Sequence, residues 1–194
     1  MHAEKPSDWV RRFAPLIREG GHVLDLAAGA GRHTRLLLDM GLNVTAIDRD
    51  VDALRGFAGS RCDVRQIDLE GGDLERGDLE TGDPDGVVAR LGDGYDGIVV
   101  ANYLHRPLLR PLAAALAPGG VLIYQTFMVG NERFGRPRNP DFLLRPGELL
   151  NAFAALTVIA FEQGEVARPR PAMIQRIAAV AGRIGVLPEA PPAR

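Results

Sequence analysis

The stretch HVLDLAAGAGRHTRLLLDM, residues 22–40, sets the fold class of the chain. It opens with a short apolar run at residues 22–27, continues through a loop of alanine and glycine, and ends with apolar residues at helical spacing. Gly41 follows, as a glycine often does where a helix ends. A strand, a tight loop of small residues and a helix in this order indicate a unit that builds parallel sheets.

The same alternation continues along the rest of the chain. Short apolar runs predict six more strands and helical spacing predicts further helices: strands at 43–47, 61–67, 95–102, 121–127, 157–165 and 172–184, and helices at 7–13, 51–57, 106–117 and 147–156. A turn joins the last two strands. We therefore predict an α/β fold, a doubly wound sheet with helices on both faces. Such sheets bind ligands at the carboxyl ends of their strands, where the strand order reverses.

The composition agrees with one globular domain. The chain has 194 residues, of which 46% are hydrophobic and 25% charged. We expect one domain over residues 1–187, a disordered tail at 188–194, and a surface loop over the acidic stretch 68–85. No apolar run is long enough for a bilayer, and the polar start of the chain does not resemble a signal peptide. Cys62 is the single cysteine, so we expect a cytoplasmic protein without disulfides.

The loop after the first strand has the features of a nucleotide-type site. Residues 25–31, DLAAGAG, allow a ligand to approach the backbone, and Asp48 follows at the end of the second predicted strand. An acid at that position accepts hydrogen bonds from a ribose diol. The dinucleotide fingerprint would need a third glycine where Thr34 stands, and no Gly-Lys-Ser/Thr of a P-loop is present.

The acidic residue and the small-residue loop resemble motif I of class I S-adenosylmethionine-dependent methyltransferases, with Ala27 in place of the first glycine of the family loop. Asp68-Leu69 is similar to the family position that contacts adenine. The resemblance implies a seven-stranded, mostly parallel, Rossmann-like sheet that ends in an antiparallel β-hairpin. It also implies that S-adenosyl-L-methionine is the cofactor, and the residues expected to hold it are Asp25, Ala27, Gly29, Gly31, His33, Asp48, Arg49, Asp68, Leu69 and Asn102.

A narrower resemblance is carried by the segments NYLHRP at 102–107, YQTF at 124–127, NPDFLL at 139–144 and PGELL at 146–150. These segments are similar to those of small bacterial methyltransferases of the tellurite-resistance type. That label implies little about the natural substrate.

The acceptor of the methyl group is expected where the fourth strand ends. His105 is the candidate base because its pKa is ordinarily near neutrality, and Tyr103 offers an aromatic wall. The alternative roles are helix capping for His105, packing on the sheet for Tyr103 and Trp9, an ion pair with a nearby acid for Arg106, and a turn for Asn102. The residues expected to bind the substrate are Arg106, Asn131, Phe134 and Trp9. In-line transfer to a small, anionic or polar acceptor is the predicted reaction.

Two other function classes remain open from the sequence. One is an NAD(P)-dependent oxidoreductase or other dinucleotide-binding protein, and the other is a cofactor-binding scaffold without activity. The four histidines and one cysteine lack metal-ligand spacing, so no metal is expected. With a net charge of −2, nucleic acid is not an expected partner, and neither is a membrane. We expect a monomer or a weak homodimer that acts on a small molecule.

Overall fold

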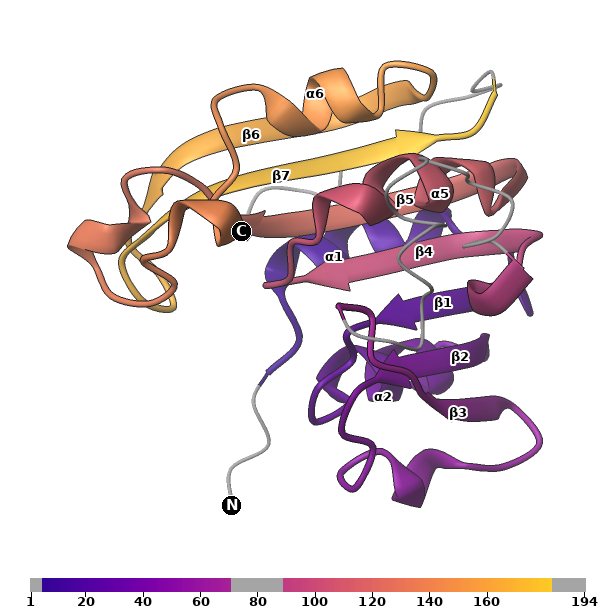
Figure 1. The fold of residues 1–194 in the computed structure, drawn as a ribbon. Coiled ribbons are helices and arrows are strands. Elements are labelled where there is room, and N and C mark those ends of the chain that lie inside the picture. The colour runs from indigo at the N-terminus through magenta and orange to yellow at the C-terminus, as the bar shows by residue number, and fades with distance from the viewer. Residues whose placement is uncertain (1–4, 71–88, 183–194) are drawn as a thin grey trace.

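A computed structural model describes residues 5–70 and 89–182 of the chain (Figure 1). Its centre is a seven-stranded sheet with the order β3-β2-β1-β4-β5-β7-β6. The strands are β1 (His22–Leu26), β2 (Asn43–Asp48), β3 (Cys62–Gln66), β4 (Tyr95–Ala101), β5 (Leu116–Phe127), β6 (Thr157–Val166) and β7 (Ala172–Val180). The predicted tail at 188–194 and most of the acidic stretch at 68–85 lie outside the described residues.

The sheet is parallel in its first five strands and antiparallel at its end. β1 pairs in parallel with β2 and β4, β2 with β3, and β4 with β5. β7 inserts between β5 and β6 and runs antiparallel to both. The predicted α/β class and the C-terminal antiparallel hairpin are therefore confirmed. The strand order reverses between β1 and β4, so a crevice opens at their carboxyl ends.

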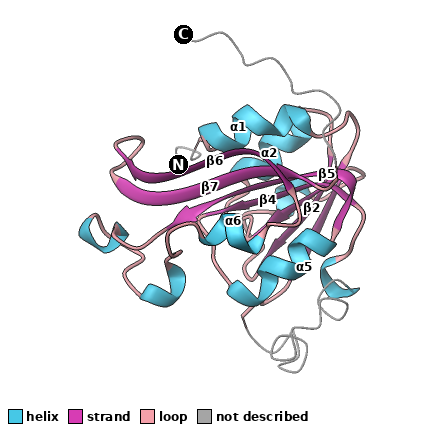
Figure 2. Ribbon diagram, turned by 90° about the horizontal axis from the view of Figure 1, so that it is seen from above, coloured by secondary structure: helices cyan, strands magenta, loops and turns pink. Residues whose placement is uncertain are grey.

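Helices cover both faces of the sheet, as Figure 2 shows. On one face lie α1 (Asp8–Phe13) and α2 (Arg32–Asp39), and on the other lie α5 (Leu109–Ala114) and α6 (Glu148–Ala152). Neighbouring strand residues alternate between the two layers, because side chains of a strand point to opposite faces. Val23 packs in the core beside α1 and α2, whereas Leu24 packs in the core beside α5 and α6.

The predicted helices at 51–57 and 106–117 differ in the structure. The second is shorter, because residues 106–108 form a 3₁₀ turn, α5 ends at Ala114 and β5 already begins at Leu116. Residues 51–57 form a short 3₁₀ turn, Arg55–Phe57, and no α-helix. The carboxylates of Asp48 and Asp50 accept hydrogen bonds from the backbone N–H groups two residues further on, and such local bonds compete with helix formation. The long segment between β5 and α6 contains the 3₁₀ turns Asn131–Arg133 and Pro140–Phe142.

The N-terminal helix is fixed against the sheet by polar contacts. Ser7 is its N-cap, because its hydroxyl accepts a hydrogen bond from the Trp9 N–H, and that hydroxyl also donates to Gln125 of β5. These contacts bring Lys5 and Pro6 to the crevice beside α2. In the ranges that the structure describes, no helix is both long and apolar enough to cross a membrane.

Candidate functional site

Two cavities adjoin at the carboxyl edge of the sheet and share Ala27 in their linings. The α2-side cavity, of about 530 Å³, lies over the loop after β1 and the start of α2. The β3-side cavity, of about 330 Å³, lies beyond the ends of β2, β3 and β4. Together they form one crevice at the point where the strand order reverses.

The loop between β1 and α2 has an unusual backbone. Ala27, Gly29 and Gly31 all have left-handed φ angles, of 54°, 56° and 77°. Gly31 is required for packing as well, since a Cβ there would lie 2.5 Å from Cε2 of Phe57. This conformation brings the loop backbone, with Ala27, Gly29 and Gly31, into the lining of the α2-side cavity.

Asp25 lies beneath this loop and lines neither cavity. It is 1% exposed, and its Oδ2 accepts a hydrogen bond of 2.6 Å from the Thr34 hydroxyl in α2. Burial raises the pKa of Asp25 to about 6, although the bond from Thr34 acts in the opposite direction. In this position the carboxyl group joins β1 to α2, so it supports the loop from below.

Asp48 lines the β3-side cavity at the end of β2, next to Arg49. Its Oδ2 accepts a hydrogen bond of 2.7 Å from the Gly29 N–H, and its Oδ1 accepts one of 3.1 Å from the Asp50 N–H. A carboxylate has about four acceptor sites, so two remain for a ligand. The side chain therefore joins the loop to the cavity and can still accept from a diol.

The end of β3 supplies the far wall of the same cavity. Asp68 and Leu69 line it together with Ile67. The Glu70 N–H donates a hydrogen bond of 3.0 Å to Asp68 Oδ1, which shapes the turn after the strand. An apolar wall beside a carboxylate suits a flat ring with an exocyclic amine.

Basic side chains collect in the α2-side cavity. Lys5, Arg32 and Arg35 line it, against the single acid Asp39. His33 also lines it; its Nε2 accepts a hydrogen bond of 3.2 Å from the Ser7 N–H, and burial lowers its pKa to about 4. His33 is therefore neutral near pH 7. Asn102, whose φ is 59°, completes this lining from the end of β4.

Two polar atoms beyond β4 are buried without partners. Tyr103 lines the β3-side cavity, while its backbone oxygen accepts a bond of 2.9 Å from Tyr124 Oη. Tyr103 Oη and His105 Nε2 each expose less than 1 Å², and neither has a hydrogen-bond partner of normal geometry in the described part of the chain. The Glu70 carboxylate lies near the Tyr103 hydroxyl, and His105 lines neither cavity. Burial, followed by the nearby Glu70, raises the pKa of Tyr103. Burial lowers the pKa of His105, against the opposing effect of Glu70.

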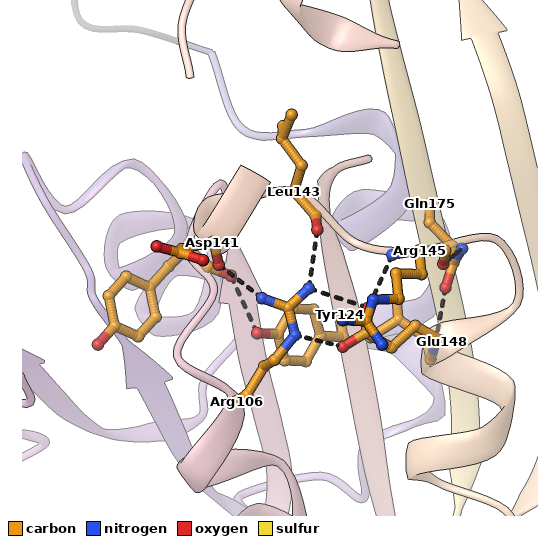
Figure 3. Close-up of polar contacts among 9 residues, drawn as sticks. Arg106, Tyr124, Asp141, Leu143, Arg145, Glu148 and Gln175 are labelled. Carbon is orange, nitrogen blue, oxygen red and sulfur yellow. Dashed lines mark hydrogen bonds and ion pairs between the residues drawn. The ribbon is translucent and has the colours of Figure 1, made fainter. Parts of the chain in front are cut away.

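Arg106 is held by the protein itself, as Figure 3 shows. Its guanidinium donates to both carboxylate oxygens of Glu148, at 2.7 and 3.1 Å. It also donates to the backbone oxygens of Asp141 and Leu143, at 2.6 and 2.8 Å. We call these four bonds the Arg106 clamp. Arg106 lines neither cavity, and an anionic substrate would have to compete with Glu148 for it.

The other residues expected to bind substrate also lie outside the two cavities. Trp9 is 2% exposed, and its Nε1 donates to the Ile177 backbone oxygen in β7. Asn131 is 1% exposed, and its Oδ1 accepts from the Met173 N–H. Phe134 lies at the surface beneath the Arg133 guanidinium, 5.1 Å from it. These three side chains therefore make contacts within the fold and do not reach either cavity.

The sequence reasoning missed three side chains of the β3-side cavity, Ile67, Glu70 and Phe142. Glu70 stands at the start of a repetitive acidic stretch, and Phe142 stands in a long segment without periodicity. Glu70 carries no local signal for a binding site, whereas Phe142 belongs to the NPDFLL segment that carries the narrower resemblance. The described residues include no group of three His, Cys, Asp or Glu side chains placed to hold a metal ion.

This strand order, with an antiparallel β7 between β5 and β6 and a small-residue loop after β1, is the fold of S-adenosylmethionine-dependent methyltransferases. No protein-family model matches the chain. The solved structure of TehB from Haemophilus influenzae is 17% identical, with a TM-score of 0.64 over 89% of this chain and 61% of that chain. The resemblance in fold that the motifs predicted is therefore confirmed.

A second neighbour was solved with a ligand. The 1,6-didemethyltoxoflavin-N1-methyltransferase of Burkholderia thailandensis, with bound 1,6-didemethyltoxoflavin and S-adenosylhomocysteine, is 22% identical, with a TM-score of 0.58 over 90% of this chain and 76% of that chain. Among curated proteins, the ribosomal RNA small subunit methyltransferase H of Nostoc punctiforme (strain ATCC 29133 / PCC 73102) is 50% identical over 40 residues. That match spans 20% of this chain and only 13% of the relative.

Proposed function

We propose that this protein is a class I methyltransferase that transfers a methyl group from S-adenosyl-L-methionine to a small polar acceptor. The proposal rests on the position and contacts of Asp48. This carboxylate ends β2 inside the crevice, accepts from the Gly29 N–H, and keeps acceptor sites for a ribose diol. The shared fold supports the same conclusion.

The two ends of the crevice fit the two ends of this cofactor. Asp48, Asp68 and Leu69 would hold the nucleoside in the β3-side cavity. Lys5, Arg32 and Arg35 would attract the carboxylate of the methionine part in the α2-side cavity. When bound, the cofactor would supply an electrophilic methyl group on a sulfonium. For an N–H or O–H acceptor we propose His105 as the proton acceptor, because burial lowers its pKa and it lies two residues beyond Tyr103; its own side chain lines neither cavity.

Ligand-induced stabilisation tests this proposal against the dinucleotide alternative. We expect S-adenosylhomocysteine to raise the melting temperature of the protein and NADH to leave it unchanged. A ligand at 100 times its Kd adds about 2.7 kcal/mol to the free energy of unfolding, which such a measurement detects readily. Stabilisation by NADH alone would contradict the proposal.

Asp48→Asn tests where the nucleoside binds. The substitution keeps the size of the side chain and removes its charge. Charge-assisted hydrogen bonds contribute about 1.5–3 kcal/mol, so we expect S-adenosylhomocysteine to bind roughly 10- to 100-fold more weakly in calorimetry. Asp50→Asn is the matched control, because Asp50 lies two residues away and lines neither cavity. Equal affinities of the two variants would show that Asp48 does not bind the ribose.

A further inference from the structure

If the protein has the proposed function, the nucleoside occupies one part of the β3-side cavity and the other part is available to the methyl acceptor. The nucleoside would use Asp48, Arg49 and the residues 67–69 after β3. The remaining lining residues, apart from the shared Ala27, are Glu70, Tyr103 and Phe142. These three residues contribute two aromatic rings and one carboxylate to the cavity wall, and we call them the acceptor end.

The acceptor end contains a buried hydroxyl, Tyr103 Oη, that has no hydrogen-bond partner of normal geometry in the described part of the protein, although the Glu70 carboxylate lies near it. Tyr103 Oη is a donor at neutral pH, as any phenol is, and burial raises its pKa further. His105 lies two residues further along the chain and lines neither cavity, and its buried Nε2 also has no partner among the described residues. A ligand with a polar group that accepts a hydrogen bond would satisfy the Tyr103 hydroxyl in the cavity wall.

None of the three residues of the acceptor end carries a positive charge. Arg106, the nearest cation in sequence, is engaged by Glu148 through the Arg106 clamp. The clamp also bonds the backbone oxygens on both sides of Phe142, so it holds this ring in the cavity wall. Arg49 is the one cation among the residues that line the β3-side cavity, and there it accompanies the three carboxylates Asp48, Asp68 and Glu70. An anionic acceptor would therefore meet repulsion.

We infer that the acceptor is an uncharged, ring-containing molecule with an N–H or O–H group, and that Glu70 is the residue that discriminates against carboxylates and phosphates. The inference rests on the proposed function and narrows it. The two aromatic side chains contact the flat apolar body, the Tyr103 hydroxyl bonds the polar group, and Glu70 makes the surroundings unfavourable for an anion.

Binding of simple probes to the protein saturated with S-adenosylhomocysteine tests the inference. Benzimidazole and phenol are the neutral probes, and benzoate and phenyl phosphate are the anionic ones. The readout is the NMR signal of the Tyr103 ring in protein with labelled tyrosine, which has three tyrosines and is assigned with Tyr103→Phe. We expect the neutral probes to shift this signal and to bind at least ~10-fold more tightly than the anions.

Glu70→Gln tests the assigned role of the carboxylate. We expect benzoate to bind this variant roughly threefold more tightly or better than the wild type, with benzimidazole little changed. Glu19→Gln, which removes a carboxylate outside both cavities, is the control and should change neither affinity. Equal binding of anionic and neutral probes, no shift of the Tyr103 signal by any probe, or the same response in both variants would overturn the inference.

Binding of S-adenosylhomocysteine is measured first on each sample. Normal binding of this ligand, together with failure of the probes, overturns the inference about the acceptor and leaves the proposed function standing. Failure of S-adenosylhomocysteine to bind overturns both.

Discussion

Ala27 holds a left-handed backbone conformation, with φ at 54°, that side chains with a Cβ rarely adopt. The conformation costs an alanine about 1–2 kcal/mol, whereas glycine adopts it freely but loses about 0.4–1 kcal/mol through its more flexible unfolded state. We therefore expect Ala27→Gly to raise the free energy of unfolding in urea by roughly 0.5–1 kcal/mol.

Ala30 provides the control for this substitution, since it lies in the same loop and is not among the residues with positive φ. Ala30→Gly should lower the free energy of unfolding by roughly 0.4–1 kcal/mol. If the two variants change stability in the same direction, the backbone of Ala27 is not strained in the protein.

Two buried groups at helix α2 have pKa values that shift in opposite directions: His33 lies in the helix and Asp25 lies beneath it. The pKa of His33 falls to about 4, below its ordinary value near 6.5, and that of Asp25 rises to about 6, above its ordinary value near 3.9. Between these values, the unfolded chain binds more protons at His33 and the folded chain binds more at Asp25. Lowering the pH through this window therefore destabilises the fold through His33 and stabilises it through Asp25.

The two effects oppose each other between about pH 4 and 6, each with a slope of up to about 1.4 kcal/mol per pH unit. We expect the free energy of unfolding of His33→Gln to fall relative to the wild type as pH rises through this window. For Asp25→Asn we expect the relative stability to rise instead. Urea unfolding at a series of pH values measures both slopes, and parallel profiles for the three proteins would contradict the assignment.

The Arg106 clamp connects the turn after β4 to the segment that precedes α6. Arg106→Lys cannot reproduce the four bonds to Glu148, Asp141 and Leu143, because an ammonium lacks the planar, forked guanidinium. We expect this substitution to lower the free energy of unfolding by about 2 kcal/mol. Arg133→Lys at the exposed pair with Glu165, whose charged atoms lie 3.7 Å apart, should change it by less than about 0.5 kcal/mol.

Trp9 joins the two ends of the described chain, since it lies in α1 and bonds the Ile177 backbone oxygen in β7. The Arg176 guanidinium also stacks on its ring at 4.6 Å. It is the only tryptophan, so its fluorescence reports on this junction. If the domain unfolds as one unit, the urea midpoints from tryptophan fluorescence and from far-UV circular dichroism should coincide.

Saturating S-adenosylhomocysteine should raise both urea midpoints together, by roughly 1–2 M at 100 times Kd. A fluorescence transition that comes at lower urea than the circular dichroism transition would mean that α1 detaches before the sheet unfolds. It would also separate Lys5 from the α2-side cavity before the site itself is lost.

The prediction from sequence was most accurate for the structure that one short segment determines by itself. From residues 22–40 and Asp48 we predicted a crevice at the carboxyl edge of the sheet, and both cavities lie at that edge. The sequence pattern failed at residues 51–57, where side-chain carboxylates bond the local backbone and prevent a helix. It also placed Trp9, Asn131 and Phe134 at a substrate site whose cavities they do not line.

Local backbone sterics and periodicity are properties of neighbouring residues, so the chain alone specified the order of strands and helices and the small-residue loop with its acid. The roles of Arg106, Tyr103 and His105 depended on packing. Arg106 meets Glu148 across 42 residues of chain, and Tyr103 and His105 keep unpaired polar atoms only because of what surrounds them. Contacts over such separations exist only when the helices and the sheet are assembled, so the tertiary structure decided which side chains form the acceptor end.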